Sequence, residues 1–167
     1  WKSVLRLMYD KAKDFVTRAF TIIFLATVII WFLQTFDFRL FVVEDSSDSM
    51  LASLGRFISP VFSPLGLSDW KLTTSLITGF TAKETVISTL AVLSGTSVDA
   101  LPAVLTSMLT TPQAVSFLLF TLLYTPCVAA VAAIKRELGS GVKAAGVSLL
   151  QCVIAWVIAC VVYNLCI

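Results

Sequence analysis

Long apolar stretches separated by shorter polar ones run through this chain of 167 residues. Three of them, at 19–36, 114–134 and 144–167, carry no formal charge. At about 1.5 Å per residue, each is long enough to cross most of a hydrocarbon core about 30 Å thick, so each predicts a transmembrane helix. A fourth stretch, 72–93, is apolar enough to enter the membrane but has two charges near its middle. The pattern predicts an all-α polytopic membrane protein, a transmembrane helix bundle with broken or re-entrant helices.

The segments between these stretches hold most of the charges. At the start of the chain, 1–18 is basic and carries an apolar stripe at helical spacing, which favours an amphipathic interfacial helix. A solvated lead-in to the first span fits that pattern equally well. Acidic residues, Pro and Gly exclude a membrane crossing between the first span and 72–93. We therefore expect an extramembrane loop with short helices over 37–71, a connecting loop over 94–113 and a basic turn over 135–143.

The composition supports a membrane protein and excludes several chemistries. Hydrophobic residues make up 58% and charged residues only 13%, too few charges to cover a soluble globule of this size. A net charge of +2 argues against a nucleic-acid-binding protein. The chain has no His and no phosphate-binding GxxxxGK[ST] motif, and its four Cys show no CxxC spacing. We therefore expect no enzyme activity, no permanently bound cofactor, no disulfide scaffold and no zinc site.

Two charged residues, Lys83 and Glu84, interrupt the stretch 72–93 shortly after Gly79. Neighbours on a helix project about 100° apart, so these two cannot form an ion pair of the usual i to i+4 kind and each needs another partner. A charge at the centre of a span costs roughly 2.5–3.5 kcal/mol on insertion scales. We therefore expect Glu84 to point into the protein, toward a cavity or a neighbouring helix.

Hydroxyl side chains recur at spacings of four and three along the same stretch, which places them on one helical face. They are Thr74, Thr78, Thr81, Thr85 and Ser88. This face favours a hydrophilic path in which Glu84 supplies a hard anionic ligand and Lys83 either neutralises it or anchors the segment. The alternative is that the hydroxyls only join packed helices.

A second interruption lies near the middle of 114–134, where Tyr124, Thr125, Pro126 and Cys127 follow one another. Pro126 has no N–H, so the carbonyl of Leu122 loses its helical partner and a break or kink is expected. Broken helices of this kind build ion sites in transporters, and a thiol offers a soft ligand for a transition metal. A plain proline kink beside a buried Cys127 is the alternative. The other three cysteines, Cys152, Cys160 and Cys166, lie roughly on one side of the last stretch. Cys152 and Cys160 are about 12 Å apart, too far to share a metal ion, and we expect all three to be packing residues.

These two interruptions carry a family resemblance. The stretches GFTAKETVISTL (79–90) and YTPCVAAVAAIKRE (124–137) closely resemble the second half of the membrane core of the ferrous iron transport protein B (FeoB) family. AFTIIF (19–24) and IWFL (30–33) resemble it too, so the resemblance covers nearly the whole chain. It implies half of the iron-translocating core of a bacterial inner-membrane Fe²⁺ uptake transporter.

The resemblance also implies site residues and partners. Fe²⁺ is then the substrate, and the membrane-embedded Cys of the second Gate region corresponds to Cys127. Glu84 matches the acidic residue of the family's AKE stretch, and we take both residues as transient Fe²⁺ ligands. The remaining site assignments are Thr125, Thr81, Thr85 and Lys83 on the ion path, with Pro126 and Gly79 as structural residues.

The implied partners are a G domain that binds GTP and Mg²⁺, the first Gate half, the bilayer, further copies of the chain and small cytoplasmic accessory proteins, but no nucleic acid. Because the chain starts with Trp and has no GTP-binding motif, we expect it to be part of a longer protein. A permease for nucleosides or organic ions, and a membrane assembly module without transport activity, are the alternatives.

The positive charges make a prediction about topology. Basic residues favour a cytoplasmic location for both 1–18 and 135–143. Four complete spans would place the second of these outside, so the charges favour a re-entrant 72–93, with a full crossing as the alternative.

Overall fold

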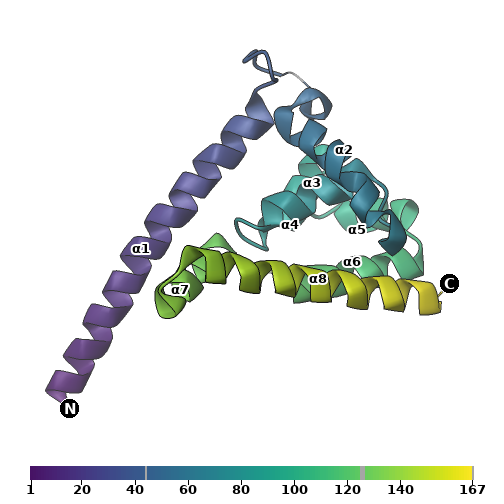
Figure 1. Cartoon of the computed structure of the whole chain (residues 1–167). Coiled ribbons are helices and arrows are strands. Elements are labelled where there is room, and N and C mark those ends of the chain that lie inside the picture. Colours follow the sequence, from purple (N-terminus) through teal and green to yellow (C-terminus); the bar gives the residue numbers. More distant parts are fainter. Residues whose placement is uncertain (44, 125–126, 167) are drawn as a thin grey trace.

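The computed structural model describes residues 1–43, 45–124 and 127–166, apart from the side chains of residues 2, 15, 18 and 19. Within this part the chain is helical, with one isolated β-bridge, and the predicted all-α class is confirmed (Figure 1). The helices in chain order are α1 (Lys2–Thr35), η1 (Ser46–Asp48), α2 (Met50–Phe62), η2 (Ser63–Leu65), α3 (Trp70–Gly79), α4 (Thr85–Leu93), α5 (Leu101–Met108), α6 (Thr111–Leu123), α7 (Val128–Leu138) and α8 (Gly141–Cys166).

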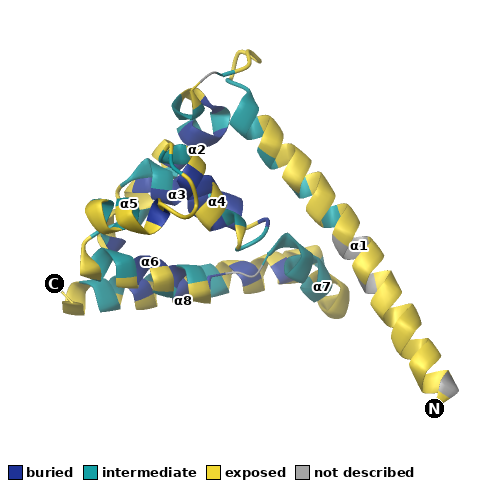
Figure 2. Ribbon diagram, turned by 180° about the vertical axis from the view of Figure 1, so that it is seen from behind, coloured by how far each residue is buried: buried dark blue, intermediate teal, exposed yellow. Residues whose placement is uncertain are grey.

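The first helix, α1, is continuous over 34 residues and joins the segments that we expected as an interfacial helix (1–18) and a span (19–36). No Gly or Pro occurs between its ends, so nothing in the local sequence stops the helix at residue 18. It stands apart from the other helices along most of its length, and most of its side chains are exposed (Figures 1 and 2). The location of 1–18 at the membrane interface stays a prediction.

Two helical units of the described chain are long and apolar enough to cross a membrane, Thr111–Leu138 and Gly141–Cys166. The first of these runs over the two residues outside the description. A third candidate is the pair Met50–Leu65 and Trp70–Gly79, which bend by 101° relative to each other and form either a broken span or a re-entrant loop. Part of this pair lies in the range 37–71, where short helices were expected, and the location of that range outside the membrane stays a prediction.

The stretch 72–93 is interrupted as predicted. Asp69 begins α3 by accepting a hydrogen bond from the backbone N–H of Lys71, and the helix ends at Gly79. Turns occupy the next five residues before α4 begins at Thr85. The two helices pack against each other, and the hydroxyl of Thr78 in α3 lies 3.0 Å from that of Thr89 in α4. They therefore form a helical hairpin.

The stretch 114–134 is also interrupted, between α6 and α7, and its helices extend beyond the predicted bounds. The side chain of Gln113 closes a capping box with Thr110, which starts α6 at Thr111. At the other end α7 continues to Leu138, so the basic segment 135–143 is not a turn throughout its length. Lys135 and Arg136 form the last turn of α7, where positive charge is favourable, and the left-handed Gly139 (φ 62°) then reverses the chain.

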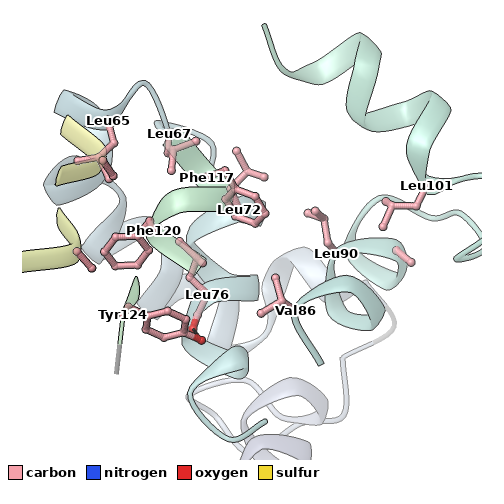
Figure 3. Packing of buried hydrophobic residues seen from close by; sticks show 13 residues of the cluster. Leu65, Leu67, Leu72, Leu76, Val86, Leu90, Leu101, Phe117, Phe120 and Tyr124 are labelled. Atoms are coloured by element: carbon pink, nitrogen blue, oxygen red, sulfur yellow. Dashed lines mark hydrogen bonds between the residues drawn. The ribbon is translucent and has the colours of Figure 1, made fainter. Parts of the chain in front are cut away.

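Helices α6 and α8 lie side by side (Figure 1). They contribute Phe117, Phe120, Ala155 and Ala159 to the buried cluster, in which Figure 3 labels the two phenylalanines. A face of small residues on α8 allows the close approach, and it consists of Ala144, Ser148, Ala155 and Ala159. The hydroxyl of Ser116 in α6 donates to the carbonyl of Ala159 at 3.3 Å. Cys152 and Cys160 pack against this core as predicted, whereas the same prediction is wrong for Cys166, which is exposed at the last residue of α8. Trp156 Nε1 donates to the carbonyl of Val61 at 2.9 Å and so ties α8 to α2.

The two basic segments lie close together in space. A guanidinium nitrogen of Arg136 in α7 lies 3.8 Å from a carboxylate oxygen of Asp14 in α1. The apolar part of α1, Phe20–Thr35, is shorter than the two candidate spans. On the prediction that α1 and α6–α7 each cross the membrane once, the chain between them must return to the side on which α1 ends. This geometry favours a re-entrant arrangement of α2–α4, in agreement with the distribution of positive charge.

Candidate functional site at two facing helix breaks

The break between α3 and α4 packs directly against the break between α6 and α7. The carbonyl of Phe80, at the end of α3, accepts a hydrogen bond of 3.0 Å from the N–H of Val128, the first residue of α7. Helix ends leave such groups without intrahelical partners, so each break satisfies a backbone group of the other. The hydroxyl of Tyr124 also donates to the carbonyl of Leu76 at 3.5 Å. Figure 3 shows Tyr124 directed toward Leu76 in the buried cluster.

Lys83 joins the two breaks at their centre. Its Nζ donates to the carbonyl of Leu122 at 3.1 Å and lies 5.1 Å from the centre of the Tyr124 ring. Leu122 holds the carbonyl whose helical partner would be the N–H of residue 126, which proline lacks. The sequence left open whether Lys83 neutralises Glu84 or anchors its segment. The structure shows that it anchors the segment, on the carbonyl released by the proline.

Glu84 does not point into the protein, so that prediction is wrong. Its side chain is exposed, and at the N-cap position of α4 it makes no capping hydrogen bond. The prediction placed Glu84 inside a membrane span, whereas the residue lies between α3 and α4 and precedes the first residue of α4. A carboxylate at the N-terminus of a helix is also favoured by the helix dipole, which lowers the need for a buried partner.

Gly79 occupies a position where the two breaks nearly touch. A Cβ at this residue would lie 2.6 Å from the Tyr124 hydroxyl oxygen, and it would also clash with a methyl group of Val86. Only a residue without a side chain lets the end of α3 approach both neighbours. The sequence marked Gly79 as structural, and the close approach supplies the reason.

The predicted hydroxyl face opens on a cavity of about 300 Å³ between the α3–α4 hairpin and α1. From the hairpin, its wall includes Thr78, Thr81, Thr85, Ser88 and Thr89. A neighbouring cavity of about 50 Å³ is lined by Thr74, Thr89, Ser46, Ser49 and other residues. Thr78 and Thr89 join the two helices, as the second interpretation of this face predicts. A hydrophilic ion path along the face stays a prediction.

The opposite wall of the larger cavity contains residues that the sequence analysis missed. Thr27, Ile30, Trp31 and Gln34 of α1 line it. Thr27 and Gln34 are polar residues seven apart in an apolar stretch, which puts them on one helical face. That spacing was the available signal.

Cys127 is the residue just before α7, where it takes the N-cap position with a half-buried, free thiol. Thr125 and Pro126, the other two predicted site residues of this break, lie outside the described residues. Within the described ranges, no three Cys, Asp or Glu side chains are grouped so that they could hold a metal ion. A cation at these breaks would therefore depend on backbone carbonyls and hydroxyls together with at most a few stronger ligands.

Comparison with known proteins decides the family. Residues 16–141 match the Gate family, described as nucleoside recognition. The chain belongs to the Gate family. Its match covers both helix breaks and both walls of the larger cavity, and it ends where α8 begins.

This Gate-family chain is homologous to the membrane region of iron transporters, which confirms the predicted resemblance. It is 36% identical to the Fe(2+) transporter FeoB of Campylobacter jejuni, over 95% of this chain and 28% of that protein. It is 33% identical to the Fe(2+) transporter FeoB of Methanocaldococcus jannaschii, over 81% of this chain and 21% of that protein. The Fe(2+) transport protein A/Fe(2+) transporter FeoB fusion protein of Porphyromonas gingivalis is 28% identical over 98% of this chain. No solved structure matches the chain.

The Gate-family chain spans about a quarter of the length of the curated relatives that it matches. The chain aligns with the membrane region of these transporters, and the alignment gives no evidence of a catalytic domain.

Proposed function

We propose that this Gate-family chain forms half of the iron-translocating core of a ferrous iron uptake transporter in a bacterial inner membrane. The observation that carries the proposal is the contact between two helix breaks, in which a carbonyl freed by Pro126 faces the AKE segment. Irregular backbone at membrane depth is tolerated where it is buried in protein or lines a polar cavity, and transporters use it for ion sites. We infer the identity of the ion, Fe²⁺, from the FeoB relatives.

The chemistry of the breaks suits a weak site for Fe²⁺. Ferrous iron accepts sulfur as well as oxygen ligands, so the thiol of Cys127 and the hydroxyls of Thr125, Thr81 and Thr85 are suitable partners. Conduction requires binding that is firm enough for entry and weak enough for release, and a site with few charged ligands meets that condition. Glu84, exposed at the mouth of the same break, offers the carboxylate that the cation meets first.

The proposal includes partners that the chain does not contain. The FeoB relatives are several times longer, and a G domain binding GTP and Mg²⁺, together with the first Gate half, would complete the transporter. The bilayer, further copies of the chain and small cytoplasmic accessory proteins are the remaining partners. GTP binding and hydrolysis belong to the G domain in this scheme.

A second candidate function follows from the Gate description and the larger cavity. Cavities of roughly 300–1,000 Å³ accommodate small molecules, and hydroxyl and amide side chains suit the hydrogen-bonding groups of a nucleoside. On this alternative, Thr81 and Gln34 bind an uncharged polar solute and Cys127 has no part in transport.

Iron uptake by the intact transporter in vesicles tests the proposal. We expect Cys127→Ser to reduce ⁵⁵Fe²⁺ uptake about tenfold, the effect of losing about 1.4 kcal/mol of ion binding. Glu84→Gln should reduce uptake less, because the side chain is exposed. Membrane insertion and GTP hydrolysis should stay unchanged. The matched control is Cys160→Ser, which replaces a half-buried thiol on α8, away from the breaks.

Two outcomes decide between the functions. Unchanged iron uptake in both Cys127→Ser and Glu84→Gln would remove these residues from the ion path. Uptake of a labelled nucleoside that Thr81→Val abolishes, with iron uptake intact, would establish the second function.

A further inference from the structure

The ammonium group of Lys83 has the surroundings of a bound cation. Among the described residues, it contacts a backbone carbonyl oxygen, at 3.1 Å from Nζ, and the face of the Tyr124 ring, with its centre at 5.1 Å. Carbonyl oxygens replace the hydration shell of ions in selectivity filters, and aromatic faces attract cations. No ion pair links Lys83 to a carboxylate among the described residues. The contacts of Lys83 are therefore those of a cation site, not those of a salt bridge.

Contacts that do not involve Lys83 hold the Leu122 carbonyl and the Tyr124 ring in place. The backbone supplies the Leu122 carbonyl, which the helix cannot use because residue 126 is proline. Tyr124 is buried, its ring stacks on Phe120 with 5.3 Å between ring centres, and its hydroxyl is held by the Leu76 carbonyl. Neither neighbour of the cation depends on Lys83 for its position.

We propose that the carbonyl of Leu122 and the ring of Tyr124 form a cation-binding site in which Lys83 is a tethered, displaceable occupant. A divalent cation that binds Cys127, three residues after Tyr124 in the chain, repels the ammonium of Lys83, because both carry positive charge. Lys83 thereby closes the break to other cations while no metal is present. The inference rests on the proposed function and adds to it the way in which the site is kept shut.

The properties of lysine suit this role. Its charge is compact, and its four-carbon stem is flexible, so the ammonium can leave without moving the backbone. If the ammonium of Lys83 occupies the cation site about nine-tenths of the time, the apparent affinity of the site for a competing ion falls about tenfold. A lysine that merely braces the two breaks would strengthen metal binding by holding the ligands in place. The two roles therefore predict opposite effects of removing the charge.

The first test measures how metal protects Cys127 in the intact transporter. The thiol is alkylated under anaerobic conditions at increasing Fe²⁺, and the modified peptide is quantified by mass spectrometry. Lys83→Met keeps the length of the side chain and removes the charge, so the half-protecting Fe²⁺ concentration should fall about tenfold relative to the original protein. Lys83→Arg keeps the charge and should stay near the original value. An equal or higher concentration in Lys83→Met would overturn the proposal.

The second test involves no iron and separates this inference from the proposed function. Lys83→Ala removes the atoms that n-propylammonium contains, so that ion should raise the unfolding temperature of the variant transporter and leave the original protein unaffected. The neutral analogue 1-propanol is the control. Equal effects of the two compounds, or equal effects on the two proteins, would overturn a cation site. Rescue by propylammonium without any protection of Cys127 by Fe²⁺ would leave the cation site standing and refute the iron route.

Discussion

Replacing Gly79 with Ala tests whether the contact between the two breaks is as close as the structure shows. The new Cβ would lie 2.6 Å from the hydroxyl oxygen of Tyr124 and still closer to a methyl group of Val86. Weak contacts between carbon and oxygen begin at about 3.3 Å, so the Tyr124 side chain would have to retreat by about 0.7 Å. Tyr124 cannot do this freely, because it stacks on Phe120 and hydrogen-bonds to Leu76.

The magnitude follows from two opposing effects. Overpacking a well-filled site typically costs about 1–3 kcal/mol. Exchanging Gly for Ala inside a helix returns up to about 1 kcal/mol, and less at a helix end such as that of α3. With about 0.5 kcal/mol returned at this helix end, the net loss for Gly79→Ala is about 0.5–2.5 kcal/mol, which corresponds to about 1–10 °C in the unfolding temperature of a domain of 150–250 residues.

Thermal unfolding of the intact transporter in detergent measures this effect. Gly146→Ala is the matched control, since a Cβ there meets no atom within 4 Å and should cause no loss of stability. Val86→Ala removes the methyl group in the way, so the double variant with Gly79→Ala should be more stable than the sum of the single losses, by about 0.5–3 kcal/mol. An unfolding temperature of Gly79→Ala equal to that of Gly146→Ala would refute the close approach.

Two further predictions concern helix packing and topology. Ala159→Leu should lower the unfolding free energy by about 1–3 kcal/mol, because Ala159 is fully buried against α6. Ile158→Leu, on the exposed side of α8, is the control and should have little effect. Equal losses in the two variants would contradict the packing of α8 on α6. Asp14→Cys and Arg136→Cys, made singly, should react with an impermeant thiol reagent from the same side of the membrane. Both variants should still fold, because an exposed ion pair contributes at most about 1 kcal/mol to stability. Labelling from opposite sides would exclude the contact between α1 and α7.

Much of the fold could be predicted from the sequence because its signals are local. A charge-free stretch such as 144–167 must be helical in a bilayer, since every backbone polar group there needs an internal partner. Pro126 removes a donor whatever surrounds it, so the loss of a helical partner for Leu122 followed from one residue type. The hydroxyl face of 72–93 followed from the period of the helix. The family resemblance rested on two ordered motifs, and the Gate match confirms it.

Other features could not be predicted, because they depend on residues far apart in the chain. The sequence showed that Lys83 and Glu84 each need a partner, but only the packing of the hairpin against α6 assigned the carbonyl of Leu122 to Lys83, 39 residues away. Glu84 lies at the N-cap of α4, where its side chain is exposed, against the prediction. The second wall of the larger cavity likewise comes from α1. Nothing in the sequence around its polar residues indicates which part of the chain they contact. Periodicity and backbone chemistry act within a few residues, so the sequence determined where the helices break. The partners of the unpaired backbone groups at the helix ends, and those of the charged side chains beside them, were decided only by the tertiary structure, which brings the two breaks together.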